Sequence, residues 1–322
     1  MISIIIPYYQ KQPGILRRSL QSVARQTYCG IAAHVIVVDD ESPSPAGIET
    51  KLLELPAWIT IEVINQKNAG PGAARNAGLD RAPDLTTYIA FLDSDDEWST
   101  EHLTRATSAL STGYDFYFAD HYQLGQDVGA FARGGRIRPE EHPQIDGAPA
   151  GLHIYQGDLF DQTLRGNVIG TSTVVYRLEK LKKQRFHVEY TKAGEDYLFW
   201  MEAARSGAKA VFSSYPEVTY GSGVNVYSAS GWGTEGHMLR IQQEIRYKKT
   251  ILKIFNPNTE QKNQVKKDIE RLRIYFIKDL LHRIRHRKKL SSRLLWNQTI
   301  QDPATWASTS SIIKNTIFKL KQ

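Results

Sequence analysis

The sequence predicts an α/β protein with a mostly parallel central sheet and a basic, helical C-terminal extension. Over residues 1–121, short apolar runs alternate with amphipathic stretches, which is the pattern of strands and helices in turn. Three of these apolar runs end in polar residues, as strands do at the ligand-binding edge of an open sheet. Charge predicts the extension, because residues 237–322 hold 20 Lys and Arg against 6 Asp and Glu.

The N-terminal elements follow from local patterns. Buried strands are short apolar runs, whereas helices space their apolar residues three and four apart, as Leu16, Leu20 and Val23 are spaced. On this basis we expect strands over residues 2–6, 34–38, 60–64 and 87–92, and helices over 15–26 and 72–80.

The rest of the chain is patterned less regularly. Residues 122–156 are rich in Gly, Pro and charge, which predicts a long loop or insert. Beyond them the sequence predicts helices over 158–164 and 195–205, strands over 172–176 and 209–212, a loop over 220–233, and a helical region from 238 that Pro257 and Pro303 punctuate.

Composition excludes several classes of protein. With 41% hydrophobic and 23% charged residues, the 322-residue chain is ordinary for a globular protein, not for a disordered or collagen-like one. No run approaches the ~18 apolar residues of a membrane-spanning helix. The N-terminus lacks the basic lead of a signal peptide, and Pro7 interrupts its apolar run. Because Cys29 is the single cysteine, no internal disulfide is possible, and we expect a cytoplasmic location.

The strongest chemical signal is the acidic segment 93–97, Asp-Ser-Asp-Asp-Glu. An apolar strand delivers these carboxylates into a turn, where they repel one another unless a cation or solvent screens them. Carboxylate oxygens suit Mn²⁺ or Mg²⁺, which also bridge to phosphate oxygens. The alternative is an acidic turn whose aspartate caps a helix that begins near Ser99.

Two other segments suit a nucleotide. Asp39 and Asp40 follow the second strand and would accept hydrogen bonds from a base or ribose, although Asp and Ser before Pro43 also form ordinary turns. Residues 68–78 are a small-residue loop that opens a helix, where a diphosphate is favoured. A dinucleotide-binding dehydrogenase is disfavoured, because this loop follows the third strand and Arg75 replaces its last glycine.

Glu195 and Asp196 begin a predicted amphipathic helix. Acidic residues at a helix N-terminus complement the helix dipole, which is the structural interpretation of this pair. The functional interpretation is a general base that removes a proton from an incoming hydroxyl group. Spacing along the chain does not decide between the two.

Together these segments resemble the family-two glycosyltransferases, which have the GT-A fold. Residues 3–10 resemble the family's opening strand, usually ending Pro-Thr-Tyr-Asn, and residues 37–42 resemble its Val-Asp-Asp-Gly-Ser. Residues 68–78 resemble Asn-x-Gly-x-x-x-Ala-Arg-Asn-x-Gly, residues 93–96 resemble Asp-x-Asp-Asp, and residues 195–196 resemble the Glu-Asp pair. The five segments occur in the family's order over residues 1–221.

The resemblance implies a role for each matching residue. Asp196 would deprotonate the acceptor hydroxyl, Asp95 and Asp93 would bind Mn²⁺ or Mg²⁺, and attack in line would invert the anomeric carbon. The nucleotide-sugar donor would contact Pro7, Tyr9, Asp39, Asn68, Gly70, Arg75, Asp93 and Ser94. Glu195, Thr171 and Tyr220 would lie on the acceptor side. Residues 1–121 and 122–236 would be the nucleotide-sugar-binding and acceptor-binding halves of a GT-A domain.

The expected function is metal-dependent, inverting transfer of a sugar from a UDP-sugar to a glycan or lipid-linked acceptor, in bacterial surface polysaccharide or glycoconjugate synthesis. Tyr8, Gln10 and Glu41 depart from the family pattern, and the Gln-x-x-Arg-Trp signature of processive synthases is absent, which favours one transfer per encounter. The alternatives are a sugar-phosphate nucleotidyltransferase, whose basic Gly-rich loop is missing after the first strand, and a non-catalytic nucleotide-sugar-binding protein of the same fold.

The basic region 237–322 has apolar residues at helical spacing, with Lys and Arg between them up to a basic run over residues 283–289. Basic amphipathic helices bind anionic membranes, at ~1 kcal/mol per Lys or Arg. We expect this region to hold the protein peripherally on the cytoplasmic leaflet, and the alternative is a helical appendage packed on the body. Residues 312–320 predict a further short helix. No nucleic-acid partner is expected, because no recognition motif is present.

Overall fold

The computed structural model describes residues 1–51, 53–224 and 231–308. The chain divides into two compact units, of which the first comprises Met1–Glu189 with Glu195–Val224 and the second Tyr190–Gly194 with Asn225–Gln322. The first unit is an α/β domain and the second is helical, as the sequence predicts.

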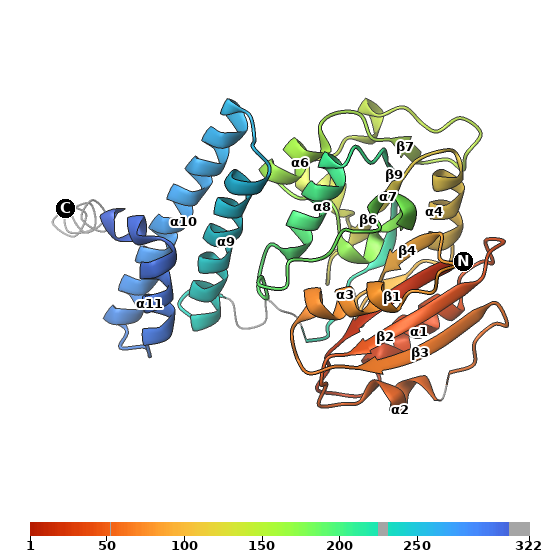
Figure 1. The fold of residues 1–322 in the computed structure, drawn as a ribbon, viewed down its shortest axis with the longest axis horizontal. Helices are drawn as coiled ribbons and strands as arrows, with labels where there is room; N and C mark the ends of the chain where they lie inside the picture. Colours follow the sequence, from red (N-terminus) through yellow and green to blue (C-terminus); the bar gives the residue numbers. More distant parts are fainter. Residues whose placement is uncertain (52, 225–230, 309–322) are drawn as a thin grey trace. The chain divides into compact units, whose positions relative to one another are not determined.

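Four parallel strands form one part of the central sheet (Figure 1). All four strands were predicted, and their ends differ by a few residues from the expected ranges. Every residue of the first strand is buried, as expected for a parallel strand that helices cover on both faces. The four parallel strands, in the order in which they pair across the sheet, are β3 (Ile59–Asn65), β2 (Ala33–Asp39), β1 (Ile2–Tyr8) and β4 (Tyr88–Phe91).

The other part of the sheet mixes strand directions. β8 (Val175–Arg177) pairs antiparallel with β4 and with β6 (Phe116–Tyr122), and β6 runs parallel to β9 (Ala210–Thr219). β5 (Glu97–Trp98) and β7 (Leu152–Ile154) pair antiparallel with β9. The sequence did not predict β6 or β5, since polar residues end β6 and β5 has only two residues.

Helices cover both faces of the sheet. Because alternate strand residues point to opposite faces, β1 supplies Ile4 and Ile6 to one hydrophobic core cluster and Ile5 to the other. The first cluster includes residues of α1 (Ile15–Ala24) and α4 (His102–Ser111), and the second includes residues of α3 (Pro71–Arg81) and α8 (Glu195–Arg205).

Gly78 allows α3 to lie close to β1. A Cβ atom at this position would lie 2.4 Å from Cγ2 of Ile5. We therefore expect Gly78→Ala to lower the free energy of unfolding by ~1–3 kcal/mol in chemical denaturation, the usual cost of overpacking a core. The control is Gly47→Ala in α2 (Ala46–Thr50), where a Cβ would meet nothing within 4 Å. Equal losses of stability in both variants would contradict this role of Gly78.

Two predicted segments need correction. The predicted loop 122–156 contains α5 (Ala130–Gly134), the 3₁₀ turn η1 (Pro139–Glu141) and β7. The predicted strand 172–176 begins only at β8, because residues Thr171–Thr173 form the 3₁₀ turn η2. There the amide and the hydroxyl of Thr173 both donate to the carbonyl of Gly170, a local bonding pattern that competes with strand formation.

The predicted helix 158–164 is confirmed as α6 (Leu159–Arg165), and α7 (Leu178–Leu181) follows β8. The predicted helix 195–205 is confirmed as α8, whereas the predicted strand 209–212 is the start of the longer β9.

The second unit consists of α9 (Glu235–Ile254), α10 (Thr259–Arg285), α11 (Ser292–Gln301) and η3 (Pro303–Ser308). Both predicted proline boundaries are confirmed. Asn258, directly after Pro257, caps the N-terminus of α10 with a capping box, and η3 begins at Pro303. Over the described part of the chain, no helix is both long and apolar enough to cross a membrane. The helix predicted at 312–320 lies outside the described residues.

Buried polar pairs join these helices. Lys248 Nζ lies 2.9 Å from Asp268 Oδ2, and His237 Nδ1 lies 2.6 Å from Asp279 Oδ2. Each pair connects α9 with α10. The basic region therefore uses some of its charges within its own helical packing.

Candidate functional site

The acidic turn, residues 93–96, follows β4 at the carboxyl edge of the parallel strands. Two segments from elsewhere in the chain hold its carboxylates. The Ser172 hydroxyl donates to Asp96 Oδ2 at 2.5 Å and accepts from the Asp93 amide at 2.9 Å. The amides of Gly221 and Gly223 donate to Asp96 Oδ1 at 3.0 Å and to Asp95 Oδ2 at 2.8 Å. The aspartates therefore do not cap α4, which was the structural alternative.

The two glycines are required at these places. A Cβ on Gly221 would lie 1.6 Å from the carbonyl oxygen of Asp95, and one on Gly223 would lie 2.6 Å from Cβ of the same residue. Only a residue without a side chain brings its amide this close to the acidic turn. Sequence reasoning missed the roles of Gly221, Gly223 and Ser172, although they lie within three residues of the predicted acceptor-side residues Tyr220 and Thr171.

The acidic turn carries unfavourable electrostatic energy. Burial raises the pKa of Asp95, and the charge of Asp93 raises it further. Burial and the charges of Asp93 and Asp95 likewise raise the pKa of Asp96. A divalent cation would relieve this repulsion, and carboxylate oxygens are the ligands that Mn²⁺ and Mg²⁺ prefer, so the residues present fit such an ion. Within the described ranges, no group of three or more His, Cys, Asp or Glu converges on a metal position.

Arg75 joins the acidic turn to the start of α8. This arginine is 4% exposed, and its Nη2 donates to Asp93 Oδ1 at 2.6 Å. Its Nη1 lies 3.7 Å from Glu195 Oε1, and its guanidinium lies 5.2 Å from the centroid of the Phe186 ring. The buried Nε and Nη1 atoms have no hydrogen-bond partner among the described residues. A buried guanidinium with unused donors suits an anionic ligand.

Glu195 and Asp196 are an acidic pair beside this arginine. Burial, and then the charge of Asp196, raise the pKa of Glu195 to about 8, against the effect of Arg75. Burial also raises the pKa of Asp196, although its Oδ1 accepts the Tyr197 amide at 2.8 Å. Carboxyl groups with raised pKa values are suited to exchange protons near neutral pH.

This pair predicts how stability depends on pH. Because the pKa of Glu195 is raised from 4.5 to about 8 in the folded chain, the folded chain binds this proton more tightly than the unfolded chain. The free energy of unfolding without ligands should therefore fall as pH rises through that window. We expect Glu195→Gln to flatten the decline in denaturation curves at successive pH values. Glu179→Gln, at an exposed site on α7, should leave it unchanged, and an equally steep decline in both variants would contradict the assignment.

Asp39 and Asp40, at the end of β2, hold the neighbouring loops. Asp39 accepts from the amides of Ser42 and Ala46, each at 2.8 Å. Asp40 accepts from the amides of Ala69 and Gly70, each at 2.9 Å. The Asn68 side chain donates to the carbonyl of Asp40 at 3.0 Å. The predicted nucleotide loop, with Asn68 and Gly70, is thus attached to the end of β2.

Glu41 has φ 58°, in the left-handed region that favours glycine. This conformation gives a physical reason for the glycine that the family pattern has at this position.

At the end of β1, neighbouring residues face different environments. Pro7 and Tyr8 are buried, and the Tyr8 hydroxyl donates to Glu49 at 3.1 Å, whereas Tyr9 is half-buried. The next residue, Gln10, donates to the Ser94 hydroxyl at 3.1 Å and accepts from the Val224 amide at 2.9 Å. Gln10 thereby links β1 to the acidic turn and to the Gly221–Gly223 segment. Its sequence signal was only a departure from the usual Asn.

Tyr220 also lies in the electrostatic field of the acidic turn. Burial raises the pKa of its hydroxyl, and the charges of Asp96, Asp93 and Asp196 raise it further. Its ring stacks on His121 with centroids 4.5 Å apart, and Gly170 leaves room for the hydroxyl. The predicted site residue Thr171 precedes Ser172 in η2 and is buried. The fold thus collects Arg75, Asp93, Asp95, Glu195, Asp196 and Tyr220 from separate segments.

Known proteins resemble this chain in sequence. The family model described as "Glycosyl transferase family 2" matches residues 3–177. The succinoglycan biosynthesis protein ExoW of Rhizobium meliloti (strain 1021) is 34% identical over 228 residues, which span 70% of this chain and 70% of ExoW.

Two solved structures share the fold. The structure of S. aureus TarS 1-349 in complex with UDP-GlcNAc has a TM-score of 0.55 at 19% identity, over 98% of this chain and 92% of that chain. The mannosyltransferase PcManGT from Pyrobaculum calidifontis, in complex with GDP-Man and Mn²⁺, has a TM-score of 0.55 at 13% identity, over 96% of this chain and 84% of that chain.

Proposed function

The chain belongs to glycosyl transferase family 2, and on that premise we propose that it transfers a sugar from a UDP-sugar to a hydroxyl group of a glycan or lipid-linked acceptor. The proposal includes a divalent metal ion and inversion at the anomeric carbon. It places the enzyme in bacterial polysaccharide synthesis, in line with the name of ExoW as a succinoglycan biosynthesis protein.

One observation carries this proposal. Arg75 contacts Asp93 of the acidic turn through one amino group and approaches Glu195 of the acidic pair through the other. An anion-binding group, a cluster suited to a cation and a pair suited to proton transfer are therefore adjacent. Metal-assisted transfer of a sugar from a nucleoside diphosphate to a hydroxyl group uses these three kinds of group.

Asp93 and Asp95 would hold the Mn²⁺ or Mg²⁺ ion, since their oxygens are hard ligands and their repulsion is relieved by a cation. When bound, the ion supplies positive charge that stabilises the nucleoside diphosphate as it leaves. The Mn²⁺ in the mannosyltransferase structure supports a role for such an ion in this fold.

The donor would lie along the ends of β1 and β2. Arg75 would bind the diphosphate through its unused buried donors, with Asn68, Gly70, Pro7 and Ser94 lining the same region. Tyr9 is half-buried and would flank the base. Asp39 would bind the base by hydrogen bonding; each of its oxygens already accepts one amide, and a carboxylate oxygen accepts a second hydrogen bond.

Asp196 would act as the general base. Its carboxylate takes the proton of the acceptor hydroxyl as that oxygen forms a bond to the anomeric carbon, while the bond from that carbon to the diphosphate oxygen breaks. Attack opposite the leaving group inverts the configuration. Glu195, Thr171 and Tyr220 would orient the acceptor, and residues 1–121 and 122–236 would be the donor and acceptor halves of the domain.

The basic region 237–322 would bind an anionic membrane and hold the enzyme peripherally at the cytoplasmic leaflet, where a lipid-linked acceptor is accessible. The excess of Lys and Arg in this region supports that part of the proposal.

Calorimetry with UDP, UDP-glucose, UDP-galactose and GDP-mannose, each with and without Mn²⁺, tests the donor site. We expect binding of UDP and of one UDP-sugar that depends on Mn²⁺. Binding of GDP-mannose alone would overturn the choice of nucleotide, and binding without any effect of metal would overturn the cation role of Asp93 and Asp95. No binding of any ligand would favour a different donor class.

A further inference from the structure

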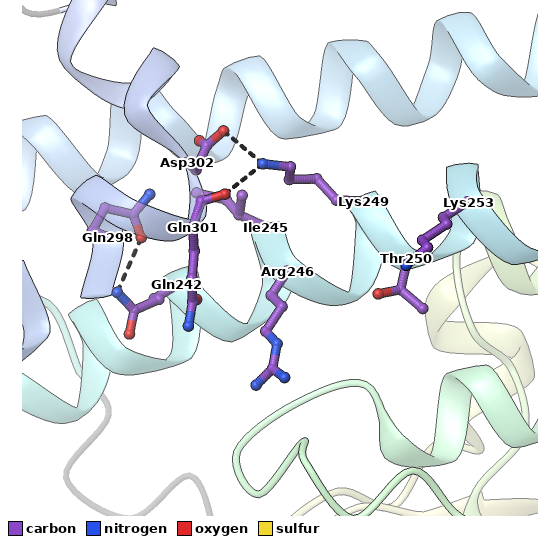
Figure 2. A pocket seen from close by; sticks show the side chains of 9 residues that line it. All are labelled: Gln242, Ile245, Arg246, Lys249, Thr250, Lys253, Gln298, Gln301 and Asp302. Atoms are coloured by element: carbon purple, nitrogen blue, oxygen red, sulfur yellow. Dashed lines mark hydrogen bonds and ion pairs between the residues drawn. The ribbon is translucent and has the colours of Figure 1, made fainter. Parts of the chain in front are cut away.

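The second unit contains a cavity of about 310 Å³ between α9 and the end of α11 (Figure 2). Its α9 wall includes Ile245, Arg246, Lys249, Thr250 and Lys253, which share one face of the helix at steps of three and four residues. Cavities that bind small ligands begin at about this volume.

Positive charge dominates the lining of the cavity. Arg246, Lys249 and Lys253 contribute three cations, and Asp302 contributes the one carboxylate among the lining residues. Like charges three or four residues apart on a helix repel one another, so this face of α9 carries an electrostatic cost that an anion would relieve.

The carboxylate of Asp302 is already bound. Arg273 donates to both of its oxygens, at 2.7 and 2.6 Å, and the Thr305 hydroxyl donates at 2.8 Å. Burial disfavours the charge of Asp302, yet these hydrogen bonds hold its pKa below the ordinary value. Because Asp302 pairs with Arg273 and with Lys249, this carboxylate does not balance the charge of Lys253.

Lys249 and Lys253 differ in their contacts. Lys249 Nζ donates to the carbonyl of Gln301 at 2.6 Å and lies 3.3 Å from Asp302 Oδ1, which fixes it at the cavity (Figure 2). Lys253 is exposed and pairs with no carboxylate within the described ranges. By contrast, Arg240 and Lys248 on the same helix pair with Glu244 and Asp268.

We propose that this cavity binds a phosphate group, either esterified in a lipid headgroup or in a soluble phosphate compound. Lys249 and Lys253 supply the charge, and Ile245 with the lysine stems covers the apolar part of an ester. The Thr250 hydroxyl, which shares a hydrogen bond of 2.7 Å with the Tyr190 hydroxyl, lies at the same wall. The proposal concerns the second unit alone and does not depend on the donor site of the first.

The test is calorimetric titration of the full chain with inorganic phosphate, with saturating UDP and Mn²⁺ present so that the donor site is filled. We expect saturable binding that Lys253→Gln weakens about tenfold, because one charge-assisted hydrogen bond is lost. Lys253→Arg keeps the charge and should retain binding. The matched control is Lys278→Gln on an exposed site of α10, which should bind as the wild type does.

Vesicles identify the source of the phosphate. Sedimentation compares phosphatidylcholine vesicles containing phosphatidic acid with vesicles given the same surface charge by oleate. A preference for phosphatidic acid that Lys253→Gln removes assigns a lipid headgroup, and phosphate binding without that preference assigns a soluble compound. The proposal is overturned if the wild type shows no saturable phosphate binding, or if Lys253→Gln and Lys278→Gln change it equally while both remain folded by circular dichroism.

Discussion

Asp196→Asn is expected to lower kcat by about 10²–10⁴-fold, the usual contribution of a general base. Asparagine has nearly the same size and still accepts the Tyr197 amide, so the start of α8 should be preserved. It does not accept a proton from the acceptor hydroxyl. The rate is measured as transfer of labelled sugar from the donor that calorimetry identifies to a bacterial lipid-linked glycan extract.

Binding of the donor should distinguish lost chemistry from lost structure. The affinity of Asp196→Asn for the nucleotide should stay near that of the wild type, since the proposed role concerns the acceptor proton alone. Asp80→Asn is the control, because Asp80 is exposed on α3 and pairs with Arg185. If Asp196→Asn keeps a rate within tenfold of the wild type, Asp196 is not the base, and the adjacent Glu195 becomes the candidate.

Asp95→Asn is expected to lower turnover by about 10²–10³-fold, the typical loss when one electrostatic contribution to a transition state is removed. The amide oxygen of the new asparagine still accepts the hydrogen bond from the Gly223 amide, so the contact between Gly223 and the acidic turn is retained. The variant lacks the charge that would hold the metal ion, and the dependence of UDP binding on Mn²⁺ should weaken in calorimetry.

The same substitution should not destabilise the protein without ligands. Burial raises the pKa of Asp95, and repulsion from the Asp93 carboxylate raises it further, so removal of the Asp95 charge should leave the unfolding temperature unchanged or raise it. Asp127→Asn, at an exposed site, is the control for both measurements. A less stable variant with normal turnover would assign Asp95 a structural role instead.

Much of the fold was predictable because its signals are local. Four parallel strands are short apolar runs in the sequence, and polar residues mark their ends, since buried strands admit few polar side chains. The proline at 257 and the capping residue after it likewise mark a helix boundary by local chemistry. The acidic turn, the small-residue loop and the acidic pair were each visible as separate segments.

The orientation of side chains within those segments was not predictable. Tyr8 and Tyr9 are the same residue type in sequence, yet one is in the core and the other is half-buried. Asp39 and Asp40 were equivalent candidates, and the structure uses them to hold two different loops. The direction of each side chain depends on the register of the strand against its neighbours.

The α/β class, the strands that end at the site and the residue types present there all follow from local patterns in the sequence. Only the tertiary structure brought Glu195 to Arg75 and Asp93, and Ser172, Gly221 and Gly223 onto the acidic turn. These contacts join segments far apart in the chain, and the packing of helices on both faces of the sheet brings them together. No local pattern encodes such contacts, because they depend on the summed burial of the core rather than on neighbouring residues.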